Sequence, residues 1–595
     1  MTGYSIISKM KILLAIILSL MAQLPAFSQL HDNTWILGYP GNGSIYGHSI
    51  LTFTEGSLQI DSNSLMNDID FPQNNSAFSN EQGDLFVFFN GLDIRNKLFV
   101  NMENGDDMHE EIDFFTGYYL SSNFITHGSV FLPYPGHKDS IILLYESTSL
   151  LLNDNGWVND IVSYDVTAAI ISTTANGGLG KVIARKNPVL TGDTLMEDGL
   201  KAVKHANGRD WWVLKPQWNS KEYYRIIIDP AGAHNLGIAS VDLPILNGGG
   251  CSTFSPDGSK YVIYNAIDVN RGSYLDIFDF DRCTGYLSKQ IQIHGTGVSG
   301  GVCISPNSRY LYHNKSDTAF QYDLHATDML ASRKVVAVND GFTDPFPVRF
   351  YMMQLAPDGR IYSSATSGAR YLHVIHRPDE AGTACGYEQR GIRLYKYNDF
   401  SVPNFPNYRL GPLDGSPCDT LGLDNLPKAW FRYEQDTLDP LRVAFRDLSY
   451  YEPATWSWDF GDPASGGSST ERHPVHQYDK AGIYQVCLTV SNTNGTDTHC
   501  KTLYLGVSAQ DNPMLQAQVS VWPNPFHDRL SVSLSASLRN PVFRLYDMTG
   551  RLVQEQRIVT GVNELETAGL TTGMYFWELT TGSERVRVGK VVKYE

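Results

Sequence analysis

A short motif that recurs about every fifty residues constrains the fold of this 595-residue chain more than any other feature. A Ser-Pro-Asp-Gly-like turn followed by an apolar strand begins at Phe254, Ile304 and Leu355, so the copies start 50 and 51 residues apart. Asp-Gly or Asn-Gly supplies the positive φ that a tight hairpin turn needs. A further strand follows most copies, which indicates about four strands per repeat. Looser copies of the pattern begin at Asn80, His137 and Ala206.

A repeat of this length with four strands is what one blade of a β-propeller requires. A blade cannot bury both of its faces alone, so blades pack side by side in a ring. The three best copies resemble the propeller repeats of TolB and WD-repeat proteins. We therefore predict a β-propeller over residues 29–424 with six or seven blades, seven being favoured, closed by a strand near Trp35. A solenoid or two β-sandwiches is the alternative.

The composition agrees with an all-β fold and excludes one class of partner. Apolar residues make up 42% of the chain, and 52 Gly and 33 Tyr suit many short strands joined by turns. The chain is too long for one core, so we expect three or four domains. The formal net charge of −17 repels phosphate backbones. We therefore expect no nucleic-acid partner.

The N-terminus predicts export. Lys9 and Lys11 precede an apolar run over residues 12–22, and the small-residue pattern ending at Ser28 is typical of a cleavage site. We predict a signal peptide over residues 1–28. The apolar run is about half of the roughly 20 residues that a membrane span needs, and no other stretch reaches that length. We therefore expect a mature protein without a transmembrane span, in an oxidising compartment.

A second region carries a different strand pattern. An aromatic motif begins at Trp456, and apolar residues alternate along a strand between 484 and 490. This region resembles the PKD domain, an immunoglobulin-like β-sandwich, and we assign residues 425–508 to it. The resemblance implies a spacer or weak binding module. The motif residues that carry it are Trp456, Trp458, Asp459, Phe460, Gly461, Asp462 and Tyr484.

The seven cysteines indicate disulfides rather than metal binding. A hairpin turn over residues 491–495 places Cys487 opposite Cys500, within disulfide distance. We predict this bridge, and we also expect Cys385 to pair with Cys418. Neither CxxC nor HExxH occurs, so we predict no metal site and no cofactor. One thiol is then left over among Cys251, Cys283 and Cys303.

The last part of the chain contains a series of short motifs in a fixed order. Their order and spacing resemble the type A C-terminal sorting domain of type IX secretion, with Trp522 where that family often has Tyr. We assign residues 518–595 to this domain, as a small β-sandwich, and residues 509–517 to a polar linker. The motif residues are Pro523, Asn524, Pro525, Asp547, Gly550, Arg551, Gly573, Tyr575 and Lys590.

The sorting resemblance implies a route and two partners. The chain would cross the periplasm and be recognised by the type IX translocon and its sortase-like peptidase. Cleavage would fall in the linker, and the product would be secreted or attached to the outer-membrane surface.

Residues with catalytic potential have simpler interpretations, so we predict no catalytic residue. Gly297 to Gly301 fit G-x-S-x-G but run into a propeller strand rather than a helix. His205, Asp210, Trp211 and Trp212 could form a sugar site, but a blade turn with core tryptophans is favoured. Carboxylates near strand ends, which glycoside hydrolysis would need as a pair, are Asp279, Asp281, Asp340 and Asp344.

Two functions are compatible with these sequence features. The sorting signal and the lack of a catalytic motif favour a secreted or cell-surface, non-catalytic binding or adhesion protein, whose propeller holds a polysaccharide or protein ligand. The alternative is an extracellular propeller enzyme acting on polysaccharide, either a glycoside hydrolase or a lyase.

Overall fold

The computed structural model describes most of the chain. The predicted signal peptide and the predicted linker lie outside the described residues. The described ranges are 29–39, 46–54, 56–63, 71, 73–108, 125–147, 149–152, 158–268, 272–295, 299–436, 438–463, 465–505, 519–534, 541–548, 551–581 and 584–594.

Antiparallel sheets make up the described part of residues 34–398, and there are seven of them. The strands of the first three are β1 (Thr34–Tyr39), β2 (Gly47–Thr54) and β3 (Ser57–Asn63); β4 (Ser76–Ser79), β5 (Leu85–Phe89) and β6 (Ile94–Asn96); and β7 (Ser129–Pro133), β8 (Ser140–Tyr145), β9 (Ser149–Leu152), β10 (Val158–Ser172) and β11 (Lys181–Leu195). A short helix, α2 (Ala175–Gly178), connects β10 to β11.

The next four sheets each contain four strands paired in chain order. They are β12 (Lys201–Lys204), β13 (Trp211–Pro216), β14 (Ser220–Asp229) and β15 (Gly232–Ile245); β16 (Gly249–Phe254), β17 (Lys260–Asp268), β18 (Gly272–Phe280) and β19 (Leu287–Gly295); β20 (Gly301–Ile304), β21 (Tyr310–Lys315), β22 (Thr318–Asp323) and β23 (Lys334–Val338); and β24 (Phe350–Leu355), β25 (Ile361–Ala365), β26 (Ala369–Ile375) and β27 (Tyr387–Asn398), with a 3-10 helix, η2 (Gly382–Cys385), before β27.

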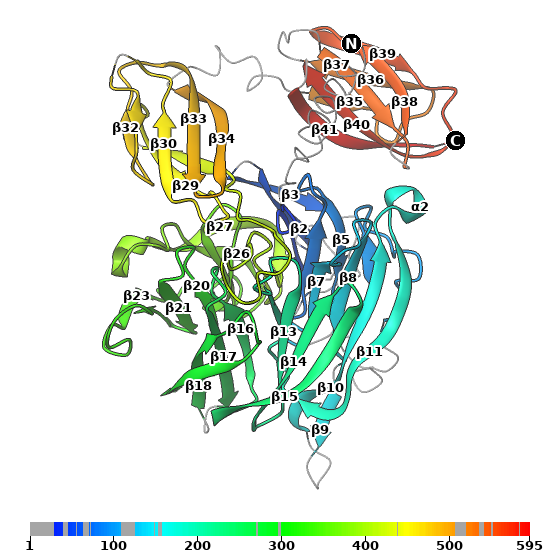
Figure 1. Cartoon of the computed structure of the whole chain (residues 1–595). Coiled ribbons are helices and arrows are strands. Elements are labelled where there is room, and N and C mark those ends of the chain that lie inside the picture. The colour runs from blue at the N-terminus through cyan, green and yellow to red at the C-terminus, as the bar shows by residue number, and fades with distance from the viewer. Residues whose placement is uncertain are drawn as a thin grey trace, which may run out of the picture.

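First strands of neighbouring sheets contact one another, which places these strands at the centre of a ring (Figure 1). The contacting pairs include β1 with β4, β4 with β7, β12 with β16, β16 with β20, and β20 with β24. This arrangement is a β-propeller, as the repeat predicts, and the all-β class is confirmed. The number of blades stays a prediction.

The recurring turn forms for a local reason. The Ser255 hydroxyl donates to Asp257 Oδ1 at 2.5 Å, and the same carboxylate oxygen accepts the Ser259 backbone N–H at 2.9 Å. Gly258, between them, has φ +73°, which a residue with a Cβ rarely adopts. The turn therefore closes with side-chain hydrogen bonds and leads directly into β17.

The chain returns to the centre of the propeller after β27. Residues 399–409, here called the plug segment, begin beside β1, where the Asp399 N–H donates to Gly38 O at 3.3 Å. The Asn404 side chain donates to Ser129 O at 2.8 Å and to Leu200 O at 3.1 Å, next to the first strands of two other sheets. Trp35 packs against Phe405 with ring centroids 6.1 Å apart. The plug segment therefore lies in the central channel.

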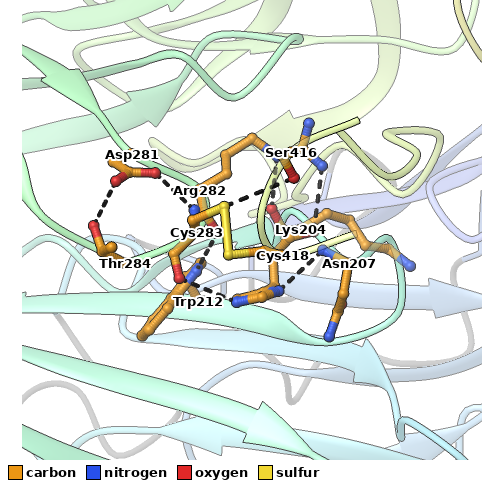
Figure 2. Close-up of a disulfide and its surroundings, with 10 residues drawn as sticks. Lys204, Asn207, Trp212, Asp281, Arg282, Cys283, Thr284, Ser416 and Cys418 are labelled. Carbon is orange, nitrogen blue, oxygen red and sulfur yellow. Dashed lines mark hydrogen bonds between the residues drawn. A yellow bond between two sulfur atoms is a disulfide. The ribbon is translucent and has the colours of Figure 1, made fainter. Parts of the chain in front are cut away.

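A disulfide fastens the chain that follows the plug segment. Cys418 pairs with Cys283, with Cα atoms 5.6 Å apart, so the expected pair Cys385–Cys418 is wrong. Cys385 is instead buried in the core between two sheets, in the short helix η2, and has a free thiol. Figure 2 shows the bridge beside Arg282, which donates from Nε to Lys204 O at 2.9 Å and from Nη2 to Gly411 O. Free thiols also remain at Cys251 and Cys303, both buried.

A two-sheet sandwich follows the propeller. Trp458, 1% exposed, packs at its centre against Phe431 and Phe445. Cys487 and Cys500, paired in register on adjacent strands, form a disulfide with Cα atoms 4.0 Å apart, the bridge that the hairpin predicts. The strands are β28 (Phe431–Gln435), β29 (Arg442–Asp447) and β32 (Val475–Gln477), then β31 (Ser468–Ser469), β30 (Thr455–Asp459), β33 (Gly482–Asn492) and β34 (Gly495–Leu505).

The C-terminal residues form a second, smaller sandwich with its own core. Buried Phe526, Leu545 and Trp577 belong to that core. Its sheets are β35 (Val519–Trp522), β36 (Arg529–Leu534) and β39 (Gly561–Glu566), and β38 (Leu552–Arg557), β37 (Pro541–Tyr546), β40 (Gly573–Thr581) and β41 (Glu584–Lys593). None of the helices in the described ranges has the length and apolar character that a membrane span requires.

Candidate functional site

The two ends of the propeller ring differ. At one end, the first hairpin turns of several sheets face the sandwich formed by β28–β34, which Figure 1 shows in yellow against the ring. There Arg432, almost fully buried, donates from Nε to Asp358 O at 2.7 Å and from Nη2 to His376 O at 3.1 Å. These carbonyls belong to the propeller, so the sandwich is fixed to this end of the ring by a buried side chain.

A carboxylate on the sandwich strengthens the same contact. Glu434 pairs with Arg432 of its own strand and with Arg360 of the propeller. Burial alone would raise the pKa of Glu434, but Arg432 and Arg360 outweigh it and hold the pKa at about 2. Glu434 therefore remains charged at any physiological pH, and the ion pairs persist.

A cavity of about 200 Å³ lies between the propeller and the sandwich. It is the part of the channel that the plug segment leaves open, and residues 447–450, Trp430 and Arg472 of the sandwich line its outer side. The first strands β12, β16, β20 and β24 form its wall, which includes Lys201 and Gln354. We call this space the channel cavity.

Lys201 is the buried cation of the channel cavity. Lys201 is 4% exposed, and its Nζ donates a hydrogen bond to Gln354 Oε1 at 3.5 Å. Within the described part of the chain, the Lys201 ammonium forms no ion pair. Burial lowers the pKa of Lys201 to about 8, although nearby Cys251, Cys303 and Asp198 raise it slightly.

The other cations of the channel cavity are matched by carboxylates. Arg409 forms two 2.7 Å hydrogen bonds to the carboxylate oxygens of Asp32. Arg472 Nε donates to Asp447 Oδ2 at 2.9 Å. Of the three cations that line the cavity, Lys201 alone lacks such a partner among the described residues.

The opposite end of the ring carries an exposed set of aromatic and guanidinium groups. We call it the aromatic surface. Phe342 and Phe346, 37% and 58% exposed, lie on the connection that precedes β24. The Phe342 ring meets Tyr371 edge-on with centroids 5.6 Å apart, and Arg390 lies 4.5 Å over it. The members of the surface are Tyr39, Tyr46, Phe342, Phe346, Arg370, Tyr371, Arg390 and Tyr397.

Ion pairs and hydrogen bonds hold the aromatic surface in place. Tyr371 Oη donates to Asp344 Oδ2 at 3.0 Å, and Arg370 lies 3.7 Å from the same oxygen. Arg370 in turn lies 5.4 Å over the ring of Tyr397. Tyr371, Arg370 and the ring beneath Arg370 are therefore held in place before any ligand arrives.

A buried polar cluster lies in the propeller interior near the channel. Lys215 Nζ contacts Glu146 Oε2 at 2.6 Å, both fully buried, and His127 Nδ1 lies 3.9 Å from Asp198 Oδ1. Burial raises the pKa of Asp198 to about 7, against the opposing effects of the Gly199 N–H and of Lys215. None of these four side chains is exposed enough to meet a large substrate. No sequence motif marks the cluster, because its members come from separate strands and loops.

The predicted carboxylate candidates are divided between the two ends of the ring. Asp279 and Asp281 lie at the end of β18, near the sandwich, whereas Asp340 and Asp344 lie in the connection at the other end of the ring. Each also has a local partner: Asp279 pairs with Lys289 at 2.7 Å, and Asp340 with Arg390 at 2.6 Å. Candidates from opposite ends of the ring therefore do not form a glycosidase-like pair.

The predicted tryptophan cluster is a turn with core residues. Trp211 and Trp212 are 0% and 2% exposed. Asp210 accepts hydrogen bonds from Asn207 and Arg209, both at 2.7 Å. Ser299, the central residue of the G-x-S-x-G match, is hydrogen-bonded to Ser316 at 2.6 Å. In the described ranges, no group of three or more His, Cys, Asp or Glu side chains is arranged to hold a metal ion.

Motif residues of the two C-terminal sandwiches make local structural contacts. In the first, Asp459 Oδ1 accepts the Gly461 N–H at 2.9 Å. In the second, Asn524 Oδ1 accepts the Val592 N–H at 2.9 Å. Gly550 lies outside the described residues. The remaining contacts are Asp462 with His476, Tyr484 Oη with Lys480 O, Asp547 with Arg551, and Tyr575 Oη with Thr571 O.

Family comparisons identify both C-terminal modules. Residues 434–507 match the PKD domain, and residues 520–594 match the secretion system C-terminal sorting domain. The sorting domain indicates export by type IX secretion to the cell surface or the medium, and interaction with that secretion system. No curated protein matches the sequence.

Solved structures give only distant likenesses. The PKD1 domain of the Vibrio cholerae metalloprotease PrtV is 32% identical, over 14% of this chain and 99% of that chain, with a TM-score of 0.12. A candidate 6-phosphogluconolactonase from Bacteroides uniformis is 13% identical, over 62% and 98%, with a TM-score of 0.33. PorZ, a surface component of the Porphyromonas gingivalis type IX system, is 10% identical, over 94% and 81%, with a TM-score of 0.21. TM-scores this low carry no argument about function. The chain is thus an exported protein in which a propeller precedes a PKD domain and a type IX sorting domain.

Proposed function

We propose that this exported protein binds an extracellular polysaccharide or protein, without chemistry, through the aromatic surface. The observation that carries the proposal is the exposure of Phe342 and Phe346 within a fixed set of tyrosines and arginines. Aromatic and arginine side chains dominate the energetics of binding sites, since they bury a large area with little loss of conformational entropy.

The domain organisation supports this role. In our proposal, residues 1–28 are a signal peptide, 29–424 the ligand-binding propeller, 425–508 the PKD spacer, 509–517 the linker and 518–595 the sorting domain. The PKD domain contacts the end of the ring away from the aromatic surface, so the spacer leaves that surface free. The translocon and its sortase-like peptidase are the export partners in this proposal.

A binding screen tests the proposal. The mature chain is applied to arrays of polysaccharides and matrix proteins, and the supernatant is examined by mass spectrometry for cleaved products. We expect saturable binding without products, and Phe346→Ser to weaken it at least about tenfold, the loss of one well-buried anchor. Leu438→Ser, at a 95% exposed position of the PKD domain, is the matched control and should bind normally. Cleaved products would favour the polysaccharide-acting enzyme instead.

A further inference from the structure

We propose that the channel cavity binds a small monoanion, the carboxylate of a short organic acid, with Lys201 as its counter-ion. This site is separate from the aromatic surface, because the cavity opens between the propeller and the PKD domain at the other end of the ring. The proposal therefore does not depend on the proposed function.

The first support is the unmatched charge. A buried ammonium is costly unless it is paired and hydrogen-bonded. Lys201 has three N–H donors, and the described residues offer it one neutral acceptor at 3.5 Å. The Gln354 side chain is held by a second hydrogen bond, from its Nε2 to Leu355 O at 3.0 Å. Moving its Oε1 closer to Lys201 would strain or break that bond. An anion in the cavity would supply the missing acceptors.

The second support is the charge of the whole cavity. Arg409 and Arg472 are each neutralised by a carboxylate, Asp32 and Asp447, as described above. One positive charge is left. A monoanion cancels it, whereas a dianion such as sulfate would bring one uncompensated negative charge, and a neutral sugar would leave the ammonium unpaired.

The third support is the size and the lining of the cavity. A volume of about 200 Å³ is several times the roughly 30 Å³ that a water molecule occupies in the liquid. A short organic acid fits in that volume. Trp430, Phe405 and Phe53 contribute apolar lining for its carbon atoms, and Thr253 and Asn407 contribute polar groups.

The titration of Lys201 gives the site a pH dependence. The groups that face Lys201 are His127 and Asp198 from the preceding loops, and Cys251 and Cys303 from the adjacent first strands. Burial lowers the pKa of Lys201 to about 8, so the free protein loses this cation as the pH rises above 8. Anion binding favours the protonated amine, and affinity should therefore fall above pH 8.

Calorimetry on the mature full-length chain tests the site, with acetate as the probe and sulfate and glucose as comparisons. We expect saturable acetate binding at pH 7 that weakens at least about tenfold at pH 9.5, since a shift of about 1.4 kcal/mol is tenfold. Sulfate and glucose should bind more weakly than acetate. Lys201→Met should abolish acetate binding.

Lys204→Met is the matched control. Lys204 belongs to the same strand, and burial also lowers its pKa to about 8, but it lies 4.4 Å over the Trp211 ring and does not line the cavity. Lys201→Gln removes the charge but keeps a polar side chain, which provides a second variant should Lys201→Met fail to fold. Equal acetate binding by the wild type and either Lys201 variant, or no saturable binding by the wild type, would overturn the proposal.

Discussion

Asp198 shows how a single buried carboxyl sets a pH dependence of stability. Its side chain is fully buried, and Oδ1 accepts the Gly199 N–H at 2.6 Å. Burial raises its pKa from 3.8 to about 7 in the folded protein, so the folded state favours the protonated form. The resulting stabilisation is fully present below about pH 4 and is lost as the pH rises through 7.

Asp198→Asn should remove that loss. At pH 8 we expect the free energy of unfolding of the variant to exceed that of the wild type by more than about 1 kcal/mol, which corresponds to a pKa shift of less than one unit. At pH 4 the two free energies should be similar. Thermal unfolding between pH 4 and 8 measures this. Parallel pH profiles for the two proteins would contradict the assignment.

Residue-scale predictions from sequence succeeded where the determinant was local. Cys487 and Cys500 could be paired because a hairpin sets their register. Cys418 could not be paired correctly, because its position depends on the path of the plug segment through the channel. No periodicity in the sequence encodes that path.

The plug segment occupies the central channel, and the Cys283–Cys418 bridge fastens the chain just beyond it. The bridge spans 135 residues, so it restricts the unfolded chain strongly. Cys283→Ser with Cys418→Ser should lower the free energy of unfolding by about 2–5 kcal/mol. It should also speed hydrogen exchange in residues 399–409, as mass spectrometry can measure.

The second disulfide provides the control. Cys487→Ser with Cys500→Ser removes a bridge that spans 13 residues within the PKD domain. Exchange in the plug segment should then be unchanged. Unchanged exchange in both double variants would mean that the Cys283–Cys418 bridge does not hold the segment in place.

At the scale of elements, the repeat predicted the propeller because each turn is encoded locally, by Pro followed by Asp or Asn and, in two of the three best copies, by Gly. The aromatic surface was not predicted, because it combines residues from both ends of the propeller sequence, such as Tyr39 and Tyr397. The channel cavity was missed for the same reason. Its wall consists of one or two residues from each of several first strands.

At the scale of the whole molecule, Arg432 helps to hold the PKD domain against the propeller. Arg432→Ala removes two charge-assisted hydrogen bonds to propeller carbonyls and should weaken PKD docking by at least about 1.5 kcal/mol. We expect a larger radius of gyration by small-angle X-ray scattering and faster proteolysis of residues 419–428. Arg442→Ala, which breaks an exposed ion pair with Asp436 inside the PKD domain, should change neither. Identical scattering from the wild type and Arg432→Ala would contradict this role.

The central claim is that an exported propeller binds its ligand through the aromatic surface without transforming it. The most direct test is the array screen of the mature chain, repeated with Phe346→Ser and with Leu438→Ser, with mass spectrometry of the supernatant. The account predicts a bound ligand, no cleaved product, and a loss of binding confined to Phe346→Ser. Cleaved product, or binding that is equally strong in Phe346→Ser, would contradict it.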